Sequence, residues 1–111
     1  MMASLHVVTS DGALRRALLT RLNRALGMDL SHDGQRQPPA ADDIVVSTTT
    51  ECPADRAAEL AASGVHVIIL SAIPREDERD RYRQAGADAY LPMSTDVTQL
   101  VDAIRHARAA V

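Results

Sequence analysis

The run VHVIIL at residues 65–70 is the most apolar stretch of the sequence. Continuous β-branched and aliphatic residues, without alternating polar side chains, are typical of a parallel strand that is buried on both faces. Gly64 ends a short helical pattern over 54–63 before this run, and a highly charged helix is predicted over 74–85 after it, stopped by Gly86. A strand between two helices predicts a βαβ arrangement and therefore a parallel sheet.

The alternation of strand and helix continues on both sides of this unit. We expect further strands at 5–9, 44–48 and 88–92, and a short strand at 28–31. Five strands that alternate with helices predict an open parallel sheet with helices on both faces. Ligands of such sheets bind beyond the carboxyl ends of the strands, so the functional question concerns the residues that follow each strand.

Two further helices are expected outside the central unit. One covers 12–26, carries leucines at every fourth position, and is capped by Ser10 or Asp11. The last helix lies near the C-terminus, where Ser94 or Thr95 is the expected cap. Both helices have one apolar face, which is the pattern of a helix packed on a sheet.

Composition limits the classes of function. The chain has 111 residues, 46% hydrophobic and 24% charged, which fits a single domain over 1–111. Its formal net charge of −3 indicates no general attraction to nucleic acid or to an anionic membrane. All 12 basic residues are arginine, so no chemistry that needs a lysine amine is expected.

Targeting and ligand signals are also missing from the sequence. No apolar run approaches the roughly 18–20 residues that span a bilayer, and the N-terminal sequence does not resemble a signal peptide. Cys52 is the one cysteine, which excludes an internal disulfide. The four histidines, His6, His32, His66 and His106, show no metal-ligand spacing. We therefore expect a cytoplasmic protein without a cofactor or a metal.

Two segments resemble the receiver domains of bacterial response regulators: VIILSA at 67–72 and QAGADAYLP at 84–92. Ser71 and Met93 are 22 positions apart, the interval that the family has between its Ser or Thr and its Lys. The resemblance covers nearly the whole chain and is thinnest between 28 and 64. It implies a flavodoxin-like (CheY-like), doubly wound α/β fold with a five-stranded parallel sheet in the order 2-1-3-4-5.

The segment 28–43 departs from the family's pattern. It carries turn and breaker signals and no apolar periodicity. Its 16 residues would have to hold a strand, a helix and two connections. We therefore expect the second helix to be lost or reduced to a turn.

The resemblance also locates a phosphorylation site, and its residues are changed. A receiver holds Mg²⁺ on an acidic pair after the first strand and accepts a phosphoryl group on an Asp that ends the third strand. The acidic pair corresponds here to Thr9 and Ser10, with Asp11 one position further on, and the acceptor corresponds to Thr48 or Thr49. Mg²⁺ prefers anionic oxygen ligands, and a Thr hydroxyl is a weak nucleophile without an adjacent base.

The other positions of that site match the family's residues only in part. The family's Lys corresponds to Met93, which offers no charge to a phosphoryl group. Ser71, at the hydroxyl position, and Tyr90, at the aromatic switch position, match the family. We therefore expect a degenerate receiver that is not phosphorylated and has no catalytic residue, so that it is not an enzyme.

The expected function is regulation by protein contact. The resemblance implies pairing through the fourth helix, fifth strand and fifth helix, with a second copy or with another protein. Arg and Tyr are enriched where interfaces are strongest. The candidate interface residues are Arg75, Arg79, Tyr82, Arg83, Asp96, Asp102, Arg105 and His106.

Two other functions stay open at this point. An atypical signalling protein could accept a phosphoryl group on Thr48, Ser71 or Asp11. A sensor could bind a small ligand in the crevice at the strand ends. The charged run from Arg75 to Arg83 could also be a solvated surface with no partner.

Overall fold

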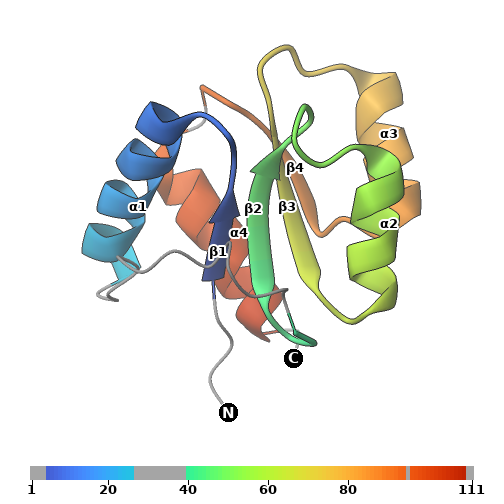
Figure 1. Cartoon of the computed structure of the whole chain (residues 1–111), viewed down its shortest axis with the longest axis horizontal. Coiled ribbons are helices and arrows are strands. Elements are labelled where there is room, and N and C mark those ends of the chain that lie inside the picture. The colour runs from blue at the N-terminus through green and yellow to red at the C-terminus, as the bar shows by residue number, and fades with distance from the viewer. Residues whose placement is uncertain (1–4, 27–39, 95, 110–111) are drawn as a thin grey trace.

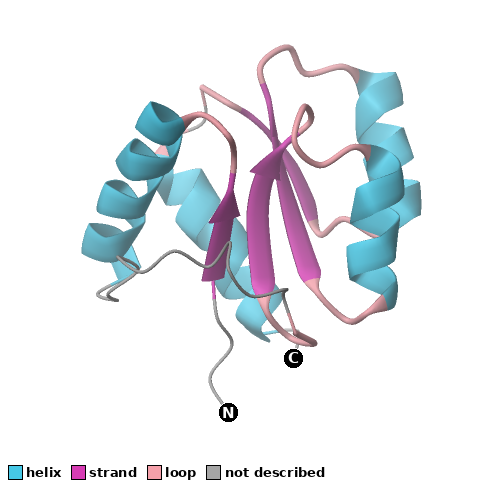
Figure 2. Ribbon diagram, viewed as in Figure 1, coloured by secondary structure: helices cyan, strands magenta, loops and turns pink. Residues whose placement is uncertain are grey.

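The computed structural model describes residues 5–26, 40–94 and 96–109. Within these ranges strands and helices alternate along the chain: β1 (Leu5–Val8), α1 (Gly12–Leu26), β2 (Ile44–Thr48), α2 (Ala54–Ala62), β3 (His66–Ser71), α3 (Glu76–Ala85), β4 (Ala89–Pro92) and α4 (Val97–Ala109). The strands form one parallel sheet in the order β1-β2-β3-β4. Helices α1 and α4 cover one face, and α2 and α3 cover the other (Figure 1, Figure 2). None of these described helices has the length and apolar character needed to cross a membrane.

The predicted α/β class and parallel sheet are confirmed. Four of the five predicted strands are present, and each lies beside the neighbour expected for it. The fifth predicted strand, at 28–31, lies outside the described residues, as does most of the segment 28–43. The complete order 2-1-3-4-5 and the reduced second helix therefore stay predictions.

The central strand β3 joins the two halves of the core. Val67 and Ile69 pack in the layer beneath α2 and α3, whereas Ile68 and Leu70 pack in the layer beneath α1 and α4. All four side chains are buried, as the uninterrupted apolar sequence predicts. Burying one such side chain stabilises a fold by roughly 1.5–3 kcal/mol, so this strand holds both helix layers against the sheet.

The start of α1 is set by Asp11. Its Oδ1 accepts hydrogen bonds from the backbone N–H groups of Ala13 and Leu14, each at 3.1 Å. Asp11 is therefore the cap, out of the predicted pair. The leucine stripe of α1 faces the sheet, where Leu18 packs against the core and Leu22 is fully buried.

The start of α4 differs from the prediction. Asp96 caps this helix by accepting the N–H of Gln99 at 3.1 Å, in place of the predicted Ser94 or Thr95. The helix begins at Val97, so Asp96 is the residue directly before it. Thr95 lies outside the described residues.

The charged helix α3 is two residues shorter than predicted. It begins at Glu76 rather than at Pro74, because the backbone of Arg75 is extended, with φ −136° and ψ 147°. It ends at Gly86 as predicted, in the left-handed conformation with φ 102°. A Cβ on Gly86 would lie 2.8 Å from the Cβ of Ala61, so this glycine also permits the close approach of α3 to α2.

Candidate functional site

The carboxyl ends of the four described strands lie along one edge of the sheet, at the top of the view in Figure 1. Thr9 follows β1, Thr48 ends β2, Ser71 ends β3 and Met93 follows β4. The structure thus brings together the four strand-end positions that the sequence predicts for the site. Thr9, Thr48 and Ser71 are buried, and Met93 is 37% exposed.

The hydroxyls of Thr9 and Thr48, at the strand ends, accept backbone hydrogen bonds that stabilise turns. The Oγ1 of Thr9 accepts the backbone N–H of Asp11 at 3.2 Å, and the Oγ1 of Thr48 accepts the N–H of Glu51 at 3.2 Å. Both are short-range contacts of the kind that Ser and Thr make in turns. Thr9 and Thr48 therefore have a local structural role.

The carboxylates of Asp11 and Glu51 lie after β1 and β2, and both accept hydrogen bonds. Asp11 caps α1, so its charge faces the positive end of that helix. Glu51, in the loop after β2, accepts a hydrogen bond from Ser10 Oγ. In the part of the chain that the structure describes, no group of three or more His, Cys, Asp or Glu side chains could hold a metal ion. The sequence patterns did not single out Glu51, because its partner lies 41 residues away.

The carboxylate of Glu78, on α3, binds Ser71 and Tyr90, the two positions predicted to match receiver domains. Ser71 Oγ donates to Glu78 Oε1 at 3.0 Å, and the hydroxyl of Tyr90 donates to the same oxygen. The Tyr90 oxygen in turn accepts the backbone N–H of Arg75 at 3.3 Å. Glu78 therefore ties the end of β3 and the strand β4 to the first turn of α3. The sequence offered no signal for this role, since Glu78 stands among many charged residues.

Met93 lies at the strand-end edge, among side chains that are mostly apolar. Its backbone N–H donates to the Ser71 carbonyl at 2.7 Å, and its side chain lines a cavity of about 200 Å³ between α1, β3 and α4. Leu14, Leu18 and Leu100 line the same cavity, and Arg21 of α1 lines it too. The thioether of Met93 itself carries no positive charge.

Tyr82 does not belong to the predicted interface. Its side chain is 3% exposed, and its hydroxyl donates to the Cys52 carbonyl at 2.7 Å. Its ring stacks on Tyr90 with centroids 5.8 Å apart. Burial, and then the neighbouring Cys52 and Glu78, raise the pKa of Tyr82 to about 12. The prediction was wrong because Tyr82 is the large side chain on the inner face of α3, where it packs with α2 and the sheet.

The lone cysteine is also part of the core. Cys52 is a free thiol, buried with Ala57 and Tyr82 beneath α2 and α3. Burial raises the pKa of the Cys52 thiol, and the positive charge of Arg56 offsets part of that rise. A protonated, buried thiol is unreactive, which agrees with its interpretation as an ordinary free cysteine.

Two histidines lie at the opposite, amino-terminal edge of the sheet. His6 Nε2 is 3.1 Å from Asp43 Oδ2, and His66 Nδ1 is 3.2 Å from Asp88 Oδ2. These pairs support the predicted structural role of both side chains within their strands. His32 lies outside the described residues.

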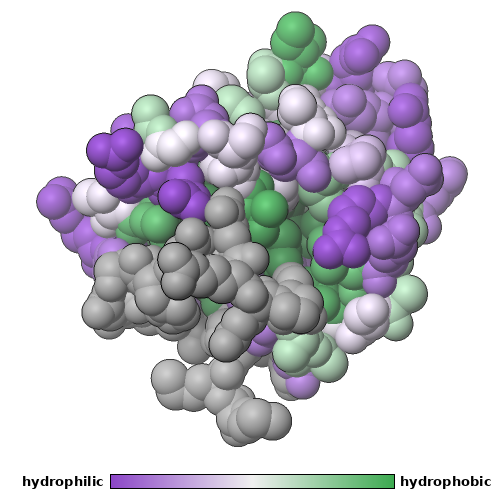
Figure 3. Space-filling view, viewed as in Figure 1, coloured by the Kyte–Doolittle hydropathy of each residue, from purple (hydrophilic) through white to green (hydrophobic). Residues whose placement is uncertain are grey.

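The other predicted interface residues are exposed on or just before α3 and α4. Three arginines lie on or just before α3, and the remaining residues lie on or just before α4. Asp96 belongs to this set and also caps α4. The exposed members are Arg75, Arg79, Arg83, Asp96, Asp102, Arg105 and His106. Ile73, in the loop after β3, is 76% exposed. Figure 3 shows a small spot of apolar side chains, in green, at the top of the view.

Comparison with known proteins identifies the fold. No family model matches the sequence, and no curated protein matches it. Three solved structures superpose on nearly the whole chain. The signal receiver domain of the response regulator NarL from Mycobacterium tuberculosis has a TM-score of 0.79 at 14% identity, covering 98% of each chain.

The other two comparisons agree with the first. A DNA-binding response regulator of the LuxR family from Staphylococcus aureus has a TM-score of 0.73 at 17% identity, covering 96% of this chain and 99% of the other. A response regulator from Thermotoga maritima has a TM-score of 0.70 at 15% identity, covering 98% and 99%. The chain therefore has the flavodoxin-like α/β fold of receiver domains.

Proposed function

We propose that this chain uses the receiver fold as a protein-interaction module whose regulation does not depend on phosphorylation. In this proposal it catalyses no reaction, binds no cofactor and acts in the cytoplasm. The observation that carries the proposal is the bond from Ser71 to Glu78, because the hydroxyl at the strand-end site already has a carboxylate partner within the chain.

The charges of the strand-end site support the same conclusion. Mg²⁺ binding needs anionic oxygens, and the carboxylates of Asp11 and Glu51 are engaged with α1 and Ser10. Phosphoryl groups need positive charge nearby, and Met93 provides none. The Thr48 hydroxyl accepts the Glu51 N–H in a turn, and a Thr hydroxyl is a weak nucleophile unless a neighbouring base activates it.

The surface formed by α3, β4 and α4 is the proposed binding face. Arg75, Arg79 and Arg83 are exposed on its α3 side, and Arg105 and His106 are exposed on its α4 side. Arginine binds carboxylates through two parallel hydrogen bonds, which suits interface ion pairs. The partner in this proposal is a second copy of the chain or another protein.

The two other functions find less support. A strand-end cavity of about 200 Å³ is smaller than the roughly 300–1,000 Å³ typical of sites for drug-sized ligands, which disfavours a ligand sensor. An atypical phosphoryl-accepting protein would need Thr48, Ser71 or Asp11 to be released from the contacts described above.

Amide NMR with Mg²⁺ and beryllofluoride, which mimics a phosphoryl group, tests the site. We expect no shift changes at Thr9, Thr48 or Ser71 beyond those caused by the same ionic strength of NaCl. Saturable shifts that cluster at these three residues would contradict the proposal and favour the phosphoryl-accepting alternative.

Light scattering of Arg79→Glu tests the binding face, with Arg81→Glu as the matched control on the same helix. If the chain forms a dimer through this face, we expect Arg79→Glu to weaken the dimer at least tenfold and Arg81→Glu to change it by less than about twofold. A dimer that neither variant alters would contradict this assignment. If the chain is monomeric, the affinity of each variant for a purified partner protein is measured instead. We then expect Arg79→Glu to bind the partner more weakly than Arg81→Glu.

A further inference from the structure

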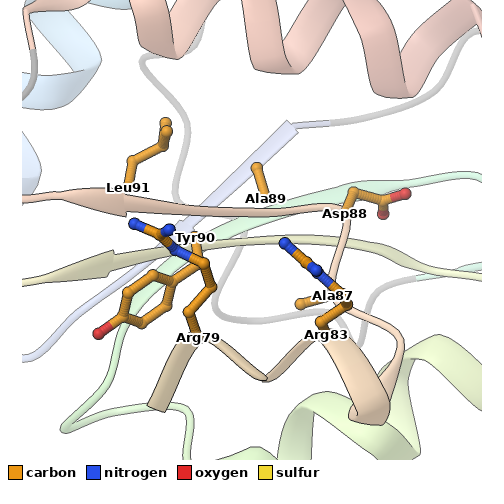
Figure 4. A pocket seen from close by; sticks show the side chains of 7 residues that line it. All are labelled: Arg79, Arg83, Ala87, Asp88, Ala89, Tyr90 and Leu91. Atoms are coloured by element: carbon orange, nitrogen blue, oxygen red, sulfur yellow. The ribbon is translucent and has the colours of Figure 1, made fainter. Parts of the chain in front are cut away.

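A cavity of about 300 Å³ lies between α3 and β4, the last strand on one side of the sheet. Figure 4 shows the side chains of Arg79 and Arg83 extending from α3 toward β4, with Tyr90 and Leu91 of the strand beside them. Both arginines are exposed. The cavity therefore presents two positive charges next to an edge strand.

These two guanidinium groups form no ion pair within the described ranges. Their helix supplies carboxylates, one of which, Asp77, pairs with Arg81 at 3.7 Å. Asp88 also lines the cavity, but its Oδ2 accepts the Val67 N–H at 3.1 Å and lies 3.2 Å from the His66 ring. In Figure 4 the Asp88 carboxylate points away from both arginines. The cavity is thus complementary to external carboxylates.

The strand β4 offers backbone groups on the same side. Among the described strands it pairs with β3 alone, so it forms one edge of the sheet. An edge strand has a row of N–H and C=O groups that can pair with an added strand. An extended peptide can bind in this way, with backbone pairing for affinity and alternate side chains for specificity.

The spacing of the arginines matches such a peptide. Arg79 and Arg83 are one turn apart, which is about 6 Å along the axis of α3. Alternate side chains of an extended strand point to one face and are about 6.6 Å apart. Two carboxylates at positions i and i+2 of a strand added beside β4 would therefore face both arginines.

We infer that the binding face takes an extended acidic segment of a partner protein, with Asp or Glu at alternate positions, as a strand added to β4. This inference rests on the proposed function and adds the chemistry of the partner to it. The carboxylates bind Arg79 and Arg83, and the backbone of the segment pairs with β4.

The test measures fluorescence anisotropy of a labelled peptide in which Glu alternates with Val, titrated with the full chain. One control peptide has Gln in place of each Glu, and a second has its Glu residues three positions apart. We expect both controls to bind at least tenfold more weakly. The variant Arg79→Gln/Arg83→Gln is expected to lose at least tenfold in affinity, whereas Arg56→Gln/Arg81→Gln, which removes the same charge from exposed positions, is expected to stay within about twofold.

Amide NMR of the complex shows which residues of the chain the peptide contacts. We expect the largest shifts at Ala89, Tyr90 and Leu91. Equal binding of the Glu and Gln peptides, equal binding by the two double variants, or shifts confined to other elements would each overturn the acidic-strand inference. A dimer or partner complex that Arg79→Glu weakens would still support the proposed function in those cases, so the two failures are distinguishable.

Discussion

Ser71 Oγ and Glu78 Oε1 are 3.0 Å apart, and this hydrogen bond joins the carboxyl end of β3 to the first turn of α3. Tyr90 donates to the same carboxylate from β4. Ser71 and Tyr90, which were predicted to match the receiver pattern, are therefore held by one side chain of the protein itself. This arrangement makes Glu78 the link between the strand-end site and the proposed binding face.

Replacing Glu78 tests the strength of this link. We expect Glu78→Ala to lower the free energy of unfolding by about 1–2 kcal/mol, because it removes hydrogen bonds from two hydroxyls to a charged acceptor, one of them from the buried Ser71. Urea denaturation measures the change. The control is Glu76→Ala, an exposed residue of the same turn, for which we expect a change within about 0.5 kcal/mol. Equal losses in the two variants would contradict the role given to Glu78.

The left-handed glycine after α3 is expected to resist substitution. Gly86→Ala places a Cβ on a residue with φ 102° and 2.8 Å from the Cβ of Ala61, so we expect a loss of at least about 1–2 kcal/mol. Gly12→Ala is the matched control, because a Cβ there meets nothing within 4 Å. Thermal unfolding should show a lower Tm for Gly86→Ala and an unchanged or slightly higher Tm for Gly12→Ala. A lower Tm for Gly12→Ala than for Gly86→Ala would show that α3 and α2 do not pack as described.

Ionisation of Tyr82 is expected to destabilise the protein at high pH. Its folded pKa of about 12 lies above the ordinary value of 10, so the folded state binds the phenolic proton more tightly than the unfolded state. The resulting stability is fully present below pH 10 and is lost as pH rises toward 12. Urea denaturation over this pH range should show a smaller decline for Tyr82→Phe than for the wild type. An equal decline of stability with pH in both proteins would mean that the Tyr82 proton does not contribute to the stability of the fold.

The buried thiol is expected to react slowly. At neutral pH, burial and a raised pKa keep Cys52 protonated and covered, so a soluble thiol reagent should modify it only when the structure opens. The measurement compares the rate of Cys52 labelling in buffer with the rate in denaturing urea. We expect labelling in buffer to be slower by at least about a hundredfold. Labelling at the rate of a free thiol in buffer would contradict the packing of Cys52 beneath α2.

Local patterns predicted much of the fold. The run VHVIIL identified the two-sided burial of β3, and Asp11 and Gly86 lie at helix ends because single residues there satisfy local backbone geometry. The prediction of Tyr82 as an interface residue was wrong, because α3 is almost entirely charged and its apolar face consists of few side chains.

The contacts of the site could not be predicted in the same way. Glu51 reaches Ser10 across 41 residues, and Glu78 meets Tyr90 across 12. These pairs depend on which strands lie side by side and on how helices cross them. The sequence predicts that the charges of a phosphorylation site are missing, but it could not predict which of the chain's own carboxylates bind the strand-end hydroxyls.

Regulation without phosphorylation can be tested by measuring the intact mass of the protein after incubation with Mg²⁺ and acetyl phosphate. We expect an unchanged mass after an acidic quench, with a receiver domain known to accept the phosphoryl group as the positive control. A mass increase of one phosphoryl group that maps to Thr48, Ser71 or Asp11 would contradict the proposed function.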